Sequence, residues 1–215
     1  DESDDTFNVA ITTTYTEPID ITHTAIGTIT DDPLDTATFN VGDATVLEGD
    51  VATVTVTLSN PSSVDTVINI VSSNGTATAP IDYTPVTTQV TIPAGQTSVT
   101  VQVTTIEDTM NEPDETVTIT GTLVSGSPSN PNDIGIVTIT DNDPLPILTI
   151  TGITVTEGNP VVFTATLSNP SSLPTTFTVV TNPGSASNLD FASIGVPVTY
   201  TIPAGDLTTT INVDT

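Results

Sequence analysis

The residues with the clearest chemical potential are carboxylates crowded into one short segment, TTIEDTMNEPDETVTIT at positions 104–120. The whole sequence has 26 Asp and Glu residues but no Lys and no Arg, so no such basic side chain can pair with them. Like charges held this close raise one another's pKa and oppose folding. The segment therefore predicts a site for an external cation, and its acids are Glu107, Asp108, Glu112, Asp114 and Glu115.

Further acids stand in short motifs elsewhere: LEGD contains Glu48, PIDY contains Asp82, and TITDNDP contains Asp141, Asn142 and Asp143. Calcium accepts about six to eight oxygen ligands from carboxylates, amides and backbone carbonyls, whereas magnesium demands octahedral geometry and retains its waters. Transition metals favour His or Cys, and the chain has one His and no Cys. Calcium is the cation that fits these residues best.

The elements that must position these acids are β-strands. Apolar residues alternate with Thr, Ser or Gln in ATVTVTLS (52–59) and TSVTVQVTT (97–105), and Phe7, Val9 and Ile11 follow the same period of two. Turn sequences such as SNPSS and PAG separate the runs. We therefore expect an all-β array of sandwiches with the acids in its loops.

The chain also repeats itself. SNPSS occurs at 59–63 and 168–172, and TIPAG occurs at 91–95 and 201–205. The period of about 110 residues is the size of a β-sandwich domain. We predict three parts: the C-terminal part of one repeat at 1–34, a complete repeat at 35–144, and the N-terminal part of a further repeat at 145–215.

Three stretches of the complete repeat carry a family resemblance: VLEGDVATVTVTLSNPSS, NGTATAPIDYTPVTTQVTIPAGQTSVTVQVTTIEDTMNEPDETVTIT and GIVTITDNDP. In this order and spacing they resemble the Calx-β domain, found in sodium–calcium exchangers and bacterial surface proteins. The resemblance implies tandem Greek-key (immunoglobulin-like) β-sandwiches that gather several Ca²⁺ ions at one end of each complete repeat. Carried over by position, the implied ligands are Glu48, Asp82, Glu107, Asp108, the carbonyl of Met110, Glu112, Glu115, Asp141, Asn142 and Asp143.

The incomplete repeats keep pieces of the same motif. Matching positions add Glu157 and Asp190 in the C-terminal part, and Glu2, Asp5, Asp31 and Asp32 in the N-terminal part. We expect the C-terminal part of one copy and the N-terminal part of the next to complete a sandwich head to tail. The connection would be either within a longer chain or between separate chains, with calcium coordinated across the junction. An open heterologous contact of this kind generates a fibre.

Composition excludes several other roles. Nucleic acids and anionic membrane surfaces attract Lys and Arg, which this chain lacks. No apolar run approaches the roughly 20 residues of a membrane span, and the acidic start DESDD is unlike a signal peptide. Paired carboxylates could serve a glycosidase, but Trp is absent and aromatics are 4% of residues, so we expect no enzyme.

We therefore predict a calcium-stiffened structural repeat of an extracellular bacterial fibre, adhesin or matrix protein. Two alternatives remain open. The first is a calcium-dependent module that binds glycan or another ligand, and the second is a regulatory calcium sensor. Tandem units of similar sequence favour an extended structural spacer over a conformational switch, so the sensor is the least favoured of the three.

Overall fold

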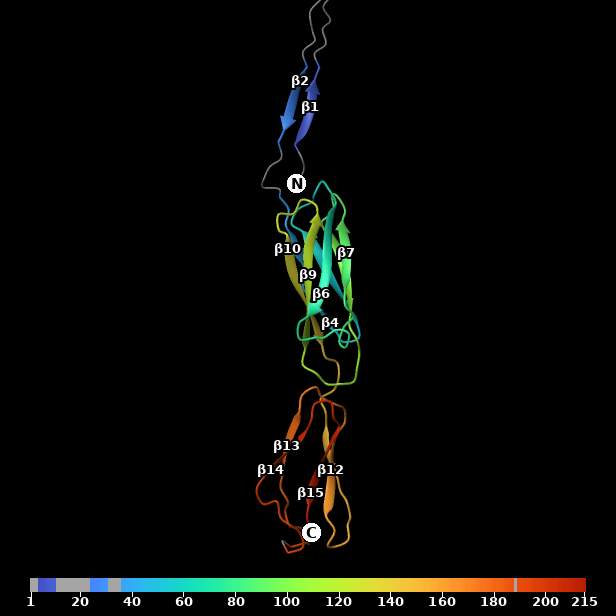
Figure 1. Cartoon of the computed structure of the whole chain (residues 1–215), viewed down its shortest axis with the longest axis vertical. Helices are drawn as coiled ribbons and strands as arrows, with labels where there is room; N and C mark the ends of the chain where they lie inside the picture. Colours follow the sequence, from blue (N-terminus) through green and yellow to red (C-terminus); the bar gives the residue numbers. More distant parts are fainter. Residues whose placement is uncertain (1–3, 11–23, 31–35, 188) are drawn as a thin grey trace, which may run out of the picture. The chain divides into compact units, whose positions relative to one another are not determined.

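The computed structural model describes residues 4–10, 24–30, 36–187 and 189–215 of the chain. These residues form 15 strands, and no helix occurs among them. Nothing helical in this part of the chain is long and apolar enough to cross a membrane. The predicted all-β fold is confirmed, as the strands labelled in Figure 1 show.

Contacts divide the chain into two compact units. The first contains Asp1–Val46, Asp50–Thr105 and Glu115–Thr138, and the second contains Leu47–Gly49, Ile106–Asp114 and Ile139–Thr215. The acidic loop 106–114 therefore belongs to the same unit as residues 145–215, which we predicted to begin a further repeat.

Two sheets build the repeat that we predicted to be complete. The first sheet has the order β3-β5-β8, and the second has the order β4-β10-β9-β6-β7. Their bounds are β3 (Phe39–Val41), β4 (Ala44–Leu47), β5 (Val51–Leu58), β6 (Thr66–Asn74), β7 (Thr87–Ile92), β8 (Ser98–Thr104), β9 (Glu115–Ser125) and β10 (Asn132–Thr140).

The alternation of apolar and polar residues sets the core. On β5, Val54 and Val56 are fully buried, while the threonines that alternate with them along the strand are exposed or half-buried. Val101 and Val103 repeat this pattern on β8, which pairs antiparallel with β5. Because side chains on one strand alternate between faces, each strand contributes every second residue to the core. At about 25 cal/mol per Å² of apolar surface removed from water, this burial is the main stabilising term.

The part of the chain predicted to begin a further repeat, residues 145–215, contains fewer strands. A three-stranded sheet has the order β11-β12-β15, and a separate pair is formed by β13 and β14. The bounds are β11 (Leu148–Thr151), β12 (Val161–Leu167), β13 (Thr175–Val179), β14 (Val198–Ile202) and β15 (Thr208–Val213).

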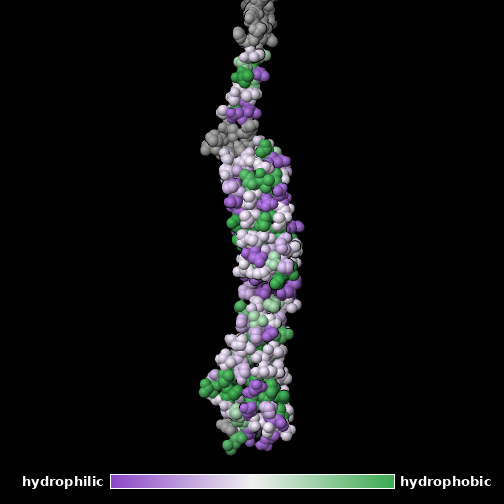
Figure 2. Space-filling model, in the orientation of Figure 1, coloured by the Kyte–Doolittle hydropathy of each residue, from purple (hydrophilic) through white to green (hydrophobic). Residues whose placement is uncertain are grey.

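An antiparallel pair, β1 (Asp5–Val9) and β2 (Ala25–Ile29), precedes β3 in sequence. Phe7 lies opposite Gly27 in its register. The predicted strand at Phe7 and Val9 is present, yet both side chains are about half exposed. Figure 2 shows how exposed hydrophobic residues interrupt an otherwise polar surface.

Candidate metal centre

Three loops of the second unit carry the acids of the site. Glu48 stands in the turn after β4, Asp108 in the loop that follows β8, and Asp143 just beyond β10. The backbone N–H of Glu48 donates to the carbonyl of Thr140 at 3.0 Å, which fixes the turn against the end of β10. Gly49 completes the turn with a φ of 80°, a left-handed conformation that favours glycine.

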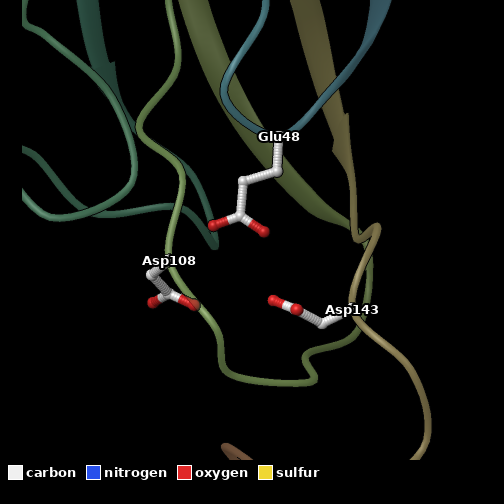
Figure 3. Close-up of side chains that lie close together, drawn as sticks. All are labelled: Glu48, Asp108 and Asp143. Atoms are coloured by element: carbon white, nitrogen blue, oxygen red, sulfur yellow. The ribbon is translucent and has the colours of Figure 1, made fainter.

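The carboxylates of Glu48, Asp108 and Asp143 converge on one point (Figure 3). Each offers an oxygen atom, and the three oxygens lie within 4.8 Å of one another. Glu48 is only 9% exposed, so its charge is largely removed from water. An all-oxygen group of this kind is the donor set that a hard divalent cation takes.

Burial and mutual repulsion both raise the pKa values of carboxylates in this group. Burial and, in decreasing order, the negative charges of Asp108, Glu107, Glu112 and Asp141 together raise the pKa of Glu48 to about 7. Desolvation also raises the pKa of Asp143, helped by the charges of Asp141, Glu107 and Asp108. An opposite charge within a few ångströms would reverse both effects.

Two buried carboxylate oxygens in this loop cluster accept no hydrogen bond. They are Oδ1 of Asp141 and Oδ2 of Asp143. A buried polar atom without a partner costs about 1–3 kcal/mol, and more when it is charged. A cation bound to these atoms would remove that penalty, so the residues present fit calcium.

Asn111 organises the cluster, and we did not predict a role for it from the sequence. Its side-chain Nδ2 donates to Oδ2 of Asp141 at 2.8 Å and to the carbonyl of Asp143 at 3.2 Å. Its backbone N–H donates to the carbonyl of Pro170, and its own carbonyl accepts from the N–H of Ser172, both at 3.1 Å. A lone Asn among acids carries no signal in sequence, because its role depends on which loops meet there.

Two other predicted ligands, Asn142 and Met110, contact the cluster as hydrogen-bond donors. Asn142 donates through Nδ2 to the carbonyl of Glu48 and to Oε2 of Glu107, both at 3.1 Å, so its nitrogen points at the acids. The N–H of Met110 donates to Oδ1 of Asp108 at 2.6 Å. Ligation by the oxygen of Asn142 or by the carbonyl of Met110 stays a prediction.

A second group of acids lies in the first unit. A carboxylate oxygen of Asp82 lies within 4.8 Å of one on Glu115. The N–H and hydroxyl of Thr78 hold Asp82 in place through its Oδ2, at 2.6 Å and 3.0 Å. Glu112 belongs to the second unit, where it is half-buried and contributes to the raised pKa of Glu48.

Among the described residues, three ligands predicted in the incomplete repeats do not belong to a cluster of three acids: Asp5, Glu157 and Asp190. Glu157 is exposed in a turn, and Asp5 is exposed on β1. Asp190 accepts from the N–H and hydroxyl of Ser187, and these hydrogen bonds lower its pKa. Glu2, Asp31 and Asp32 lie outside the described residues.

The chain matches the model of one known domain family. A family model described as the Calx-beta domain matches residues 30–143, a range that contains Glu48, Asp108 and Asp143. No curated protein sequence matches the chain.

Several solved structures are also similar to this chain, at low sequence identity. The apo form of the Calx CBD1 domain is 22% identical, covers 50% of this chain and 98% of its own, and has a TM-score of 0.42. The calcium binding domain CBD12 of CALX1.1 is 18% identical, covers 81% of this chain and 74% of its own, and has a TM-score of 0.43. The periplasmic chaperone SfaE is 11% identical with a TM-score of 0.37, covering 83% of this chain and 86% of its own.

Proposed function

Because the chain belongs to the Calx-beta domain family, we propose that it binds calcium through Glu48, Asp108 and Asp143 and that the bound ion stiffens a structural repeat. The proposed role is not enzymatic. It suits a module of an extracellular fibre, adhesin or matrix protein, where calcium is available at concentrations that match the roughly 10⁻⁴–10⁻³ M affinities of extracellular modules.

One observation carries the proposal: three acids meet within 4.8 Å in a chain that has no Lys and no Arg. Two neighbouring buried carboxylate oxygens have no hydrogen-bond partner. The cost of this arrangement falls when a divalent cation neutralises it, and binding to the folded state alone stabilises that state by RT ln(1 + [L]/Kd). The ion supplies positive charge to the carboxylates, while the loops supply the oxygens.

Stiffening follows from what the acidic loop touches. Asn111 links Asp141 and the carbonyl of Asp143 to the backbone of Pro170 and Ser172 in the SNPSS turn of the last repeat. An ion that orders loop 106–114 therefore also orders its hydrogen bonds to that turn. Pro144 and Pro146 limit backbone freedom in the short connection between β10 and β11.

Titration calorimetry tests calcium binding. The double variant Glu48→Gln/Asp143→Asn should weaken one class of sites at least tenfold, about 1.4 kcal/mol. The double variant Asp206→Asn/Asp214→Asn also removes two negative charges, but from exposed positions, and should bind calcium as the parent chain does. Equal calcium affinity in all three proteins would contradict the proposed site.

Hydrogen exchange tests the stiffening separately. The amides of Asn111 and Ser172 form the hydrogen bonds that join the two loops. Calcium should slow their exchange by at least tenfold, because opening then requires release of the ion. The amide of Val54, at the centre of the core strand β5, should respond less. Calcium binding without protection of Asn111 and Ser172 would leave a metal site but remove the stiffening role.

A further inference from the structure

The last repeat is a sandwich that lacks two central strands. By the sequence repeat, β11, β12 and β15 correspond to β3, β5 and β8, while β13 and β14 correspond to β6 and β7. In the complete repeat, β9 and β10 stand between β6 and β4. Residues 145–187 and 189–215 contain no counterpart of either strand. One edge of β13 is therefore without the neighbour that β6 has.

The neighbours of the missing strands have lost regular structure. Residues Ser72–Asn74 of β6 pair with β9 beyond the end of the β6–β7 ladder. Their counterparts 181–183 lie outside β13, which ends at Val179. Likewise, β4 pairs with β10, and its counterpart 153–156 is not a strand. These segments have strand-forming counterparts but lack the partner that would order them.

An apolar groove marks the same place. Two adjoining cavities of about 350 and 200 Å³ open beside β12 and β15 and share Phe163, Thr181 and Val213 in their linings. Ile150 and Val179 line the smaller one. In the complete repeat, the counterparts of Ile150, Phe163 and Val179 are at most 2% exposed, namely Val41, Val54 and Ile70. Ile150 itself is 50% exposed, and hydrophobic surface of this kind is drawn green in Figure 2.

The β1–β2 pair carries the sequence of the missing strands. DTFNV on β1 corresponds to ETVTI at the start of β9, and AIGTI on β2 corresponds to GIVTI in β10. Phe7, Val9 and Ile29 are 53%, 45% and 60% exposed, whereas their counterparts are at most 5% exposed: Val117, Ile119 and Ile139.

The pair also keeps the volume that such a core needs. Phe7 stands where β9 has Val117, and Gly27 stands where β10 has Val137. A Cβ atom on Gly27 would meet the ring of Phe7, so the larger side chain occupies the space that the smaller residue leaves. Volume-conserving exchanges are those that cores tolerate best.

We propose that the β1–β2 pair of one copy docks into the groove of a second copy and supplies the two missing strands. The register of β6 and β9, in which Ser72 faces Ile119 and Ser73 faces Thr118, transfers to the junction. Val9 then lies opposite Thr181 and Asn8 opposite Asn182, while β2 runs beside 153–156. Strand addition at an open sheet edge is an established mode of recognition. Because the pair and the groove are different surfaces, the contact is heterologous and extends into a fibre.

The chain has no native cysteine, so cross-linking tests the register without background. Chains with Val9→Cys and chains with Thr181→Cys, mixed under mild oxidation, should form a disulfide-linked heterodimer as the main product. Asn8→Cys mixed with Thr181→Cys should give at least fivefold less, because Asn8 points to the other face of its strand. Equal yields in the two mixtures would overturn the register. A single chain that carries both Val9→Cys and Thr181→Cys should not form the disulfide within itself at high dilution; if it mainly did, a second copy would not be the occupant of the groove.

Light scattering of the intact chain tests assembly itself, with and without calcium. The mean mass should rise with concentration, and Val9→Asp should return the chain to monomer. Val64→Asp changes a side chain of similar exposure, 49%, on a loop of the complete repeat and should leave assembly intact. A parent chain that stays monomeric at all concentrations would overturn the proposal. Assembly that persists in chelator would support it even if the calcium proposal failed.

Discussion

At the scale of single residues, Glu48 should make stability depend on pH in the metal-free protein. Its pKa rises from 4.5 to about 7 on folding, so between these pH values the folded state holds a proton that the unfolded state releases. The contribution of this proton to the free energy of unfolding is complete below pH 4.5 and is lost as pH rises through about 7. The shift corresponds to at most about 3 kcal/mol.

Urea unfolding in chelator at several pH values measures this dependence. Glu48→Gln should flatten the curve between pH 4.5 and 7, leaving a residual slope from Asp143, whose pKa is also raised. Calcium needs the ionised carboxylate, so its affinity should rise over the same interval. An unchanged slope in Glu48→Gln would show that Glu48 does not carry the effect.

Asn111 allows a second test at this scale. Asn111→Ala removes the donor to Asp141 and to the carbonyl of Asp143, and should weaken calcium binding by about 1–2 kcal/mol, roughly 5- to 30-fold. Asn159→Ala removes a comparable local donor, to the carbonyl of Thr156, and should leave calcium affinity unchanged. Equal affinity for Asn111→Ala and the parent chain in calorimetry would mean that the acids hold their positions without it.

At the scale of elements, two glycines in turns form a matched pair. Gly49 and Gly95 have φ values of 80° and 77°, so alanine at either position should cost about 1 kcal/mol of backbone strain. A Cβ on Gly95 would meet no atom within 4 Å, whereas one on Gly49 would lie 3.0 Å from Cβ of Glu107. Both variants should therefore lose similar thermal stability in chelator, apart from this crowding.

Only Gly49→Ala should also lose calcium affinity, because the new Cβ forces Glu107 to move. Glu107 accepts a hydrogen bond from Asn142, which also donates to the carbonyl of Glu48, so its displacement disturbs the metal site. Calorimetry on the two variants separates the effects, since the strain common to both cancels in the comparison. If Gly95→Ala weakened calcium binding as much as Gly49→Ala, strain in a distant turn and not displacement of Glu107 would be the cause.

The strands and the acidic loops were predictable from sequence, since alternation in segments such as 52–59 reports which face is buried. The convergence of Glu48, Asp108 and Asp143 was implied by family resemblance, not by spacing, because 95 positions separate the first from the last. Asn111 and the loss of strand at 153–156 were not predictable. Both depend on which segments come into contact, and local residue types carry no information about that.

At the scale of the whole molecule, a formal charge of −26 at pH 7 with no Lys or Arg to offset it makes the compact state repel itself. Monovalent salt should therefore raise the melting temperature in chelator, since the Debye length falls to about 10 Å at 0.1 M. Screening acts on all acids alike, however, whereas calcium acts where carboxylates converge. Calcium chloride and sodium chloride at equal ionic strength should thus give different melting temperatures, with calcium higher.

The variant Glu48→Gln/Asp143→Asn separates screening from binding. It should keep the full response to sodium chloride, because 24 of the 26 acids remain, and should lose part of the additional rise in calcium. Asp206→Asn/Asp214→Asn, with the same net charge, should keep both responses. Differential scanning calorimetry of the three proteins decides the matter: if calcium and sodium stabilise the parent chain equally at matched ionic strength, diffuse screening alone neutralises these acids, and no specific ion is needed to hold the loops.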